Sequence, residues 1–409
     1  MAFDLHAAIG KLAGFNDERA GTGVTREVYT PTYRRAIAWV ADRMREAGLE
    51  PRFDAVGNLL GRWPGTDPDA PVVMTGSHVD TTLDAGRFDG VAGVLGAVAA
   101  VHRLRAEGVA LRRGIEVVSF AGEEPRFGTG CVGSRAMAGG LGRADLDRLT
   151  DRDGVSMAAA LTDAGFDPGA LGEARLDPAR VHAFVELHIE QGAVLETTGD
   201  DVGVVTAIAA PHDLRLTLRG RAAHAGATPM ALRRDALAGA AEILVELERL
   251  ARASPSGTTV GTVGVLRVEP GAVNVVPGRA ELEVDVRDSD LEAREATVRA
   301  LLDAAIAIGA HRGLEVEVAE MVRDDPVRCA PHVVEAVAAA AAELGVAARE
   351  MTSGAYHDAM VLGAAGVPVG MVFVPSRGGV SHHPDEHTDP DELDTGVAVL
   401  AGALRRLAA

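Results

Sequence analysis

One imidazole and three carboxylates fall within twelve residues of the chain, at His78, Asp80, Asp84 and Asp89. Imidazole nitrogen and carboxylate oxygen are ligands that zinc and related divalent metals accept, so this spacing suits a metal site. Asp89 is equally suited to capping a helix, which is the commonest task of an aspartate just before one. On these residues alone, both interpretations stay open.

The pattern around these residues predicts a strand, a polar loop and a helix. The apolar run 72–74 indicates a buried parallel strand that ends near His78 and Asp80. From Gly90 to about Glu107 the apolar residues recur at helical spacing. In open α/β sheets ligands bind in the loop outside the carboxyl end of a strand. The polar residues occupy such a loop.

Two further apolar runs also end in polar clusters. A run over 114–122 ends on Glu123 and Glu124, and a run that starts at Val181 ends on His188. Parallel strands present their carboxyl ends at the same edge of a sheet. We therefore expect these side chains to lie close to the first cluster.

A later polar loop, SHHPDEHT, is expected to bring further histidines to this edge. A site for two metals bridged by one carboxylate needs imidazoles and carboxylates. Five residues have the required types: His78, Asp89, Glu124, His188 and His382. Such a site also needs a base. Neighbouring residues at the end of a strand point in different directions, so one glutamate of the pair can bind metal while the other faces the substrate.

Each of these assignments has a structural alternative. Adjacent glutamates usually form a solvated loop, but Glu123 and Glu124 end an apolar strand, where unpaired carboxylates are costly. His188 alone fits a hydrogen-bonded core histidine, and only its combination with the other clusters favours ligation. Cys131 suggests a thiol nucleophile, yet no His or Asn partner is identifiable for it. We interpret Cys131 as a small packing residue.

The composition is that of an ordinary globular protein, with 47% hydrophobic and 24% charged residues in a chain of 409. The net charge of −19 argues against a nucleic-acid partner, which requires a basic face. Two cysteines are too few for a disulfide framework. We find no signal-peptide pattern and no apolar run near the ~20 residues that a membrane span needs. We expect a cytoplasmic enzyme without a membrane partner.

The segment 211–324 has a different pattern from the rest of the chain. Alternating strands and two helices, over 231–253 and 291–312, follow in the order βαββαβ of a ferredoxin-like motif. We predict that this domain is inserted into an α/β domain made of residues 1–210 and 325–409. The outer domain is expected to hold a mixed, largely parallel sheet.

Ten motifs, which extend from about Gly57 to the C-terminus, agree with one enzyme family in order and spacing. They are GSHVDT, GRFDG, EEPRFG, GSRAMAG, ELHIEQG, GRAAHAGATPM, NVVPG, DVR, SGAYHDA and SHHPDE. The chain thereby resembles the hydantoinase/carbamoylase branch of the dinuclear zinc amidohydrolase and peptidase superfamily. That branch includes N-carbamoyl-L-amino acid hydrolases, allantoate amidohydrolases, ureidoglycolate amidohydrolases and β-ureidopropionase of the yeast type.

The resemblance implies a metallopeptidase-like catalytic domain with two divalent ions, zinc first, with manganese, cobalt or nickel as alternatives. It assigns the two metals to these sets: His78, Asp89 and His188, and Asp89, Glu124 and His382. His382 rather than His383 matches the ligand, because it directly follows the serine of the family's Ser-His-x-Pro pattern. Glu123 is implied as the general acid/base, and Asp80 as the residue that orients His78.

The resemblance also places substrate-binding residues in the inserted domain, through which family relatives form homodimers. The implied substrate-binding residues are His224, Asn274 and Arg287, with Gln191 and His357 nearby. Two departures bear on the substrate. Asp84 stands where many relatives have asparagine, and Tyr356 replaces a common glycine, as in ureidoglycolate amidohydrolases.

These observations predict a hydrolase that cleaves a linear ureido or N-carbamoyl amide of a small carboxylate, of the N-carbamoyl-L-amino acid or allantoate type. A metal-bridging hydroxide would attack the carbonyl, Glu123 would carry the proton to the leaving nitrogen, and His224 would stabilise the oxyanion. The enzyme alternatives are a ureidoglycolate amidohydrolase, or an aminoacylase or dipeptidase of the wider superfamily. An inactive binding protein on this fold would have lost a ligand or Glu123, and every one is present.

Overall fold

The computed structural model describes residues 3–17 and 21–409. Within this chain, two compact units separate. Unit 1 consists of Met1–Thr206, Arg328–Met351 and His357–Ala409, and unit 2 consists of Ala207–Val327 and Thr352–Tyr356.

A nine-stranded sheet forms the centre of unit 1. Its path runs β1-β2-β4-β3-β5-β15-β6-β13, and β14 pairs with β6. The strands are β1 (Glu50–Phe53), β2 (Leu59–Trp63), β3 (Val72–His78), β4 (Ile115–Phe120), β5 (Val181–Ile189), β6 (Val202–Ile208), β13 (Val327–Arg328), β14 (Ala348–Ser353) and β15 (Val369–Val374). Strands β4, β3, β5 and β15 pair in parallel, whereas β1 with β2, β2 with β4 and β6 with β15 pair antiparallel. The predicted mixed, largely parallel sheet is therefore confirmed.

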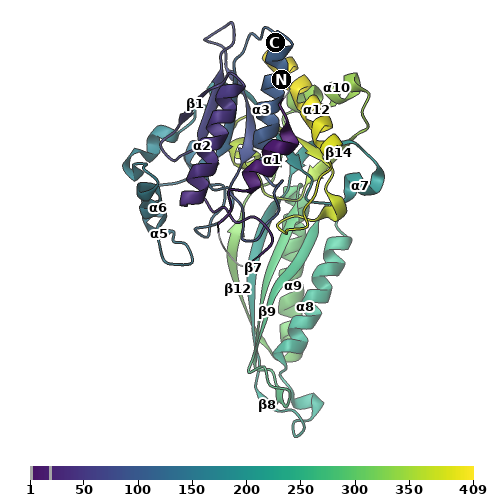
Figure 1. Ribbon diagram of the computed structural model, residues 1–409. Helices are drawn as coiled ribbons and strands as arrows, with labels where there is room; N and C mark the ends of the chain where they lie inside the picture. The colour runs from purple at the N-terminus through teal and green to yellow at the C-terminus, as the bar shows by residue number, and fades with distance from the viewer. Residues whose placement is uncertain (1–2, 18–20) are drawn as a thin grey trace. The chain divides into compact units, whose positions relative to one another are not determined.

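Every residue of β3, β4 and β15 is buried, because helices cover the centre of this sheet on both faces. Helix α12 packs against both α3 and α10, all three contact the central strands, and α4 and α11 contact each other (Figure 1). The helices are α1 (Leu5–Ala13), α2 (Pro31–Glu46), α3 (Val91–Ala106), α4 (Val132–Met137), α5 (Arg143–Arg148), α6 (Met157–Asp163), α7 (Val194–Thr198), α10 (Pro331–Leu344), α11 (Asp358–Ala364) and α12 (Pro390–Ala408), with 3-10 turns at Pro168–Ala174, Pro178–Arg180 and Arg377–Gly379.

Unit 2 pairs a four-stranded antiparallel sheet with two helices on one face. The sheet order is β12-β7-β11-β9, and the hydrophobic core lies between this sheet and the helices (Figure 1). The elements are β7 (Ala210–Arg219), α8 (Ala236–Arg252), β9 (Val260–Glu269), β11 (Arg279–Asp288), α9 (Leu291–Arg312) and β12 (Glu315–Arg323), with a short ribbon of β8 (Ala223–His224) and β10 (Val275–Val276). The long elements follow in the order βαββαβ. The dimerisation role of this segment stays a prediction.

Helix α8 begins later than the sequence pattern predicts. The expected start at residue 231 was wrong, because Met230–Leu232 form a separate 3-10 turn. Asp235 ends this connection, and its side chain accepts a hydrogen bond from the N–H of Ala238 (3.1 Å). An aspartate at this position fixes the first turn of a helix, so the helix starts at Ala236.

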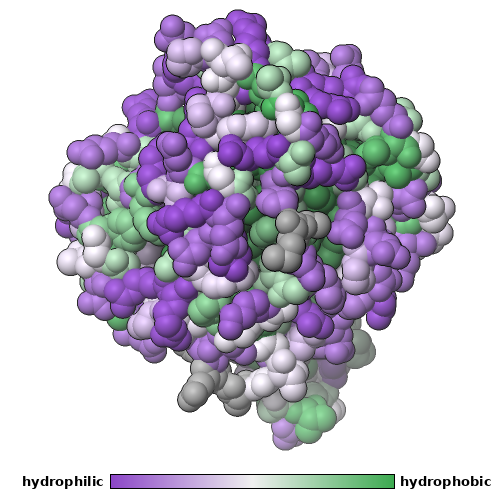
Figure 2. Space-filling view, turned by 45° about the horizontal axis from the view of Figure 1, so that its top comes forward, coloured by the Kyte–Doolittle hydropathy of each residue, from purple (hydrophilic) through white to green (hydrophobic). Residues whose placement is uncertain are grey.

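Hydrophilic side chains cover most of the face seen in Figure 2, and apolar residues form only small groups on it. Among the described residues, no helix is long and apolar enough to cross a membrane. The cytoplasmic location stays a prediction.

Candidate metal centre

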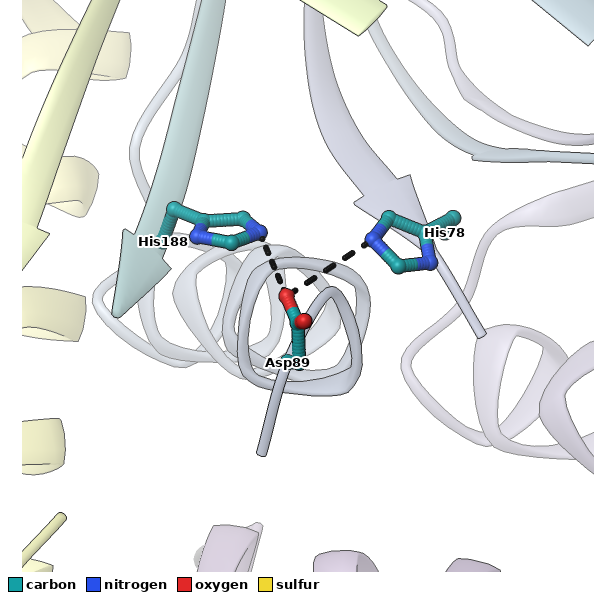
Figure 3. Close-up of side chains that lie close together, drawn as sticks. All are labelled: His78, Asp89 and His188. Carbon is teal, nitrogen blue, oxygen red and sulfur yellow. Dashed lines mark ion pairs between the residues drawn. The ribbon is translucent and has the colours of Figure 1, made fainter. Parts of the chain in front are cut away.

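Two parallel strands and one loop bring three candidate ligands together. His78 ends β3, His188 lies near the end of β5, and Asp89 precedes α3. Figure 3 shows both rings pointing at the same carboxylate. The Nε2 atom of His188 lies 3.2 Å from Asp89 Oδ1, and that of His78 lies 3.9 Å from it. All three side chains are buried, and their ligand atoms lie close enough together to hold one metal ion. We call such a set of candidate metal ligands a donor group.

Main-chain carbonyls fix both rings so that their Nε2 atoms face Asp89. The Nδ1 atom of His78 lies 3.0 Å from the carbonyl oxygen of Asp80, and that of His188 lies 2.8 Å from the carbonyl oxygen of Ile189. A carbonyl only accepts, so each neutral ring donates from Nδ1 and presents a lone pair at Nε2. This is how ligating histidines are oriented in metal sites.

A second donor group shares the Asp89 carboxylate. The Nε2 atom of His382 lies 3.0 Å from Asp89 Oδ2 and 3.5 Å from Glu124 Oε1. His383 turns elsewhere, because its Nδ1 accepts the N–H of Asp385 (3.2 Å). Ligands around a tetrahedral zinc ion lie about 3.3 Å apart, since each is about 2.0–2.1 Å from the metal. The two groups have the donors and the spacing for one ion each, with one oxygen of Asp89 in each group.

The pKa values of the side chains in and beside these groups also favour bound cations. Burial and the charge of Glu124 raise the pKa of Glu123 well above its ordinary value. Burial and the charge of Asp89 raise the pKa of Glu124 to about 8. Although burial opposes it, the hydrogen bond with Asp89 raises the pKa of His188 to about 9. The cluster thus binds extra protons when it is alone, and divalent ions would supply the same positive charge. The residues therefore fit two metals.

Asp80 contacts three residues of the site. Its carbonyl oxygen contacts His78, whereas its carboxylate Oδ1 is farther from that ring, at 3.8 Å from Nδ1. The carboxylate instead accepts the N–H groups of Glu123 (3.4 Å) and Glu124 (3.0 Å). The side chain of Asp80 therefore holds the turn that carries both glutamates.

Glu123 and Glu124 point in different directions from this turn. Glu124 lies with Asp89 and His382, whereas Glu123 Oε2 lies 3.7 Å from His78 Nε2. The Cys131 thiol, interpreted from the sequence as packing, is buried and donates to Glu123 Oε1 at 3.6 Å. Glu123 is thus beside the cluster without belonging to either donor group.

Two residues that support Asp89 were missed by the sequence interpretation. Gly90 has φ of 63°, and a Cβ there would lie 2.4 Å from His78 Nε2, so only glycine leaves room for the ligand. Glu386 accepts the N–H groups of Phe88 (2.7 Å) and Asp89 (3.0 Å). No side chain caps α3. The capping role considered for Asp89 is therefore wrong.

Gln191 and His357 lie next to the ligands, as the resemblance implies. Gln191 has φ of 58°, and its Nε2 donates to Asp89 Oδ2 (3.1 Å) and Ser381 Oγ (3.2 Å). The ring of His357 packs edge-on against His188, with centroids 4.6 Å apart. Burial lowers the pKa of His357 well below its ordinary value, so this ring is neutral. With His188 and the buried Glu186 it forms a third possible donor group.

His224 and Asn274 are the first two predicted substrate-binding residues of unit 2. His224 ends β8, and Asn274 directly precedes β10. The Nδ1 atom of His224 accepts the N–H groups of Gly226 (3.1 Å) and Ala227 (3.2 Å). The neutral ring, which is exposed, therefore carries its proton on Nε2 and can donate it. Asn274 is also exposed, and its main-chain carbonyl accepts the N–H of Ala225 (2.9 Å).

The remaining substrate-side residues have local partners. Arg287 is paired with Asp285, and the Tyr356 hydroxyl donates to Asp324 Oδ2 (2.9 Å). In unit 1, Asp84 Oδ1 accepts the N–H of Gly23 (2.6 Å), so this departure from the family pattern serves local folding. Substrate contacts of these residues stay predictions.

The fold and the donor groups define an α/β protein with two potential metal positions around a shared carboxylate at the strand ends. Residues 73–406 match the model of peptidase family M20/M25/M40, and the chain belongs to this family, which is metal-dependent.

Three similar proteins cover almost the whole chain. N-carbamoyl-L-amino acid amidohydrolase of Geobacillus stearothermophilus is 45% identical over 94% of this chain and 94% of its own length. Ureidoglycolate hydrolase of Arabidopsis thaliana is 40% identical over 98% of this chain and 86% of its own length. The crystal structure of an amidase of the hydantoinase/carbamoylase family from Burkholderia multivorans has a TM-score of 0.92 and 35% identity, covering 99% of this chain and 97% of that one.

Proposed function

We propose that the protein is a dinuclear metal amidohydrolase that cleaves a linear ureido or N-carbamoyl amide of a small carboxylate. The observation that carries this proposal is the pair of donor groups that share Asp89, with Glu123 beside them and outside both. The names of two similar proteins, an N-carbamoyl-L-amino acid amidohydrolase and a ureidoglycolate hydrolase, support ureido substrates of these types. We assign the ions to zinc, with manganese, cobalt and nickel as alternatives.

The residues divide the reaction between them. Two bound divalent ions would polarise the substrate carbonyl and lower the pKa of a bound water. Glu123 takes a proton from the attacking water and delivers it to the leaving nitrogen. Burial and the charge of Glu124 raise the pKa of Glu123 well above its ordinary value, which makes this carboxyl group a better proton acceptor than an ordinary glutamate. His224 donates from Nε2 to the developing oxyanion, and Arg287 holds the substrate carboxylate.

A substrate panel tests the proposed reaction. Ureido acids, namely N-carbamoyl-L-amino acids, allantoate and ureidoglycolate, are expected to be cleaved with kcat/KM about a hundredfold or more above that of their carboxamides, because an unpaired arginine is left in the amide complex. N-acetyl amino acids and dipeptides form the second arm. Preference for that arm would indicate an aminoacylase or dipeptidase, and no turnover of any compound would indicate a binding protein. Glu123→Gln protein purified in the same way controls for contaminating hydrolases.

We further propose that unit 2 forms a two-fold homodimer. Its sheet has two open edges, β9 and β12, which carry exposed apolar side chains: Val260, Leu266, Val318 and Met321. Such edges are usually covered, because they expose unpaired backbone groups. In this dimer His224 acts on the substrate held by the partner subunit.

Complementation between inactive subunits tests this arrangement. His224→Ala and Glu123→Gln proteins are each expected to be nearly inactive. When equal amounts are mixed and exchange subunits, about half of the dimers are mixed, and one of the two sites in each mixed dimer is intact. About a quarter of the wild-type activity is therefore expected to return. Light scattering would check the dimer, and labelled subunits would check exchange. A monomer at assay concentration, or no recovery in verified mixed dimers, would refute the shared site.

A further inference from the structure

Arg287 is held by a carboxylate of its own strand. In β11 the residues alternate between buried apolar side chains, which face the helices, and half-buried charged side chains on the other face. Asp285 and Arg287 are neighbours on that charged face. Arg287 Nε lies 3.0 and 2.9 Å from the two oxygens of Asp285, and Nη2 lies 2.8 Å from Oδ2. The Asp285 carboxylate therefore binds one edge of the guanidinium group, the edge that Nε and Nη2 form.

This contact determines which part of Arg287 is left for a ligand. A guanidinium group has five N–H donors in one plane. Asp285 takes one donor from Nε and one from Nη2, and the carbonyl of Gly354 accepts a third from Nη1 (3.2 Å). One donor on Nη1 and one on Nη2 remain outside these bonds. A carboxylate with two oxygens can accept both of them.

We infer that Asp285 is a positioning residue, which fixes Arg287 so that its Nη1 and Nη2 edge receives the substrate carboxylate. This inference rests on the proposed function. A free arginine has many side-chain conformations and loses them when it binds. Because Asp285 already restricts those conformations, the substrate does not have to order the arginine, which favours binding.

Electrostatic repulsion between Asp285 and the substrate carboxylate would have the opposite effect, so the direction of the change in substrate binding distinguishes the two. Asp285 is negative and would repel a substrate carboxylate bound to the far edge of Arg287. Asp213 lies directly opposite Asp285 in the β7–β11 register and adds to the local negative charge. If repulsion were dominant, removing Asp285 would tighten substrate binding. If positioning is dominant, removing it weakens binding.

The experiment compares Asp285→Ala with Glu281→Ala. Glu281 lies on the same strand and face and binds an arginine two residues away, with Arg279 Nη2 2.6 Å from Glu281 Oε2, so it is a matched control. For a ureido acid, Asp285→Ala is expected to raise KM about tenfold and to leave turnover of the carboxamide unchanged. Glu281→Ala is expected to leave KM unchanged. A lower or unchanged KM in Asp285→Ala overturns the inference.

Two additional variants separate this inference from the proposed function. Arg287→Ala should abolish the preference for the acid over the carboxamide, and adding Asp285→Ala to it should not raise KM further. If Arg287→Ala keeps the preference, the carboxylate contact in the proposed function is wrong. If Arg287→Ala abolishes the preference but Asp285→Ala does not weaken it, only the positioning role is wrong. If Asp285→Ala fails to fold, Asp285→Asn replaces it, because asparagine keeps the size of the side chain. Its KM should lie between that of the wild type and the roughly tenfold higher value expected for Asp285→Ala.

Discussion

Glutamine in place of Glu123 is expected to lower kcat by about a hundredfold to ten-thousandfold, the usual contribution of a general acid/base. Glutamine has nearly the same size, but it cannot take a proton from water or return one to the leaving nitrogen. Because Glu123 lies outside both donor groups, the variant should retain its metals. Steady-state kinetics and elemental analysis of the same preparation would measure both quantities.

Glu124→Gln is the matched control for this prediction, since it makes the same change one residue away. Glu124 shares a donor group with Asp89 and His382, so its loss should weaken one of the two metal sites. The two variants should therefore differ in metal content before they are compared in rate. Equal metal loss in both would show that the roles of the adjacent glutamates are assigned wrongly.

The strands that carry this site could be predicted because the centre of a parallel sheet is buried on both faces. Such strands are rich in apolar residues, and β3, β4 and β5 are almost completely buried, with the candidate ligands at or just beyond their ends. The sequence therefore locates candidate ligands wherever a run stops. Strand β14 was not predicted, because only its last residue is buried and its place is set by pairing with β6, far away in the chain.

Side-chain directions within the site were harder to predict. His382 and Gln191 have φ of 53° and 58°, in a region of backbone conformation that residues other than glycine rarely adopt. The direction of each side chain follows from this backbone, which no local pattern specifies. Glu386 contacts the Asp89 loop across almost three hundred residues, so its role depends on the completed fold. The proposal of Asp80 as a ring-orienting residue likewise missed that its carboxylate is bound by two N–H groups.

Removal of divalent metal is expected to abolish activity and also to lower the melting temperature. Ions that bind only the folded protein stabilise it, by about 4 kcal/mol when free metal is about a thousandfold above its Kd. Chelation followed by dialysis should remove this stabilisation, and zinc, manganese, cobalt or nickel should restore it together with activity. Full activity in a sample that elemental analysis shows to be metal-free would refute the metal centre.

Asp89→Asn tests whether one carboxylate serves both ions. Because Asp89 contributes an oxygen to each donor group, this variant should lose metal from both sites. Asp84→Asn makes the same change in the same loop, at a side chain that binds Gly23 instead, and should keep its full metal content. Loss of only one equivalent in Asp89→Asn would mean that the two ions do not share this residue.

The stabilising effect of metal is also expected to increase with pH. In the metal-free protein the pKa of Glu124 is about 8, above the ordinary value of 4.5. Its protonated form therefore contributes stability that is complete below about pH 4.5 and is lost as the pH rises towards 8. Ions that neutralise the carboxylate remove this loss, because metal binding displaces the proton. The difference in melting temperature between metal-loaded and metal-free protein should thus be larger at pH 8 than at pH 5.5, and an equal or smaller difference would contradict the assignment of Glu124 as a ligand.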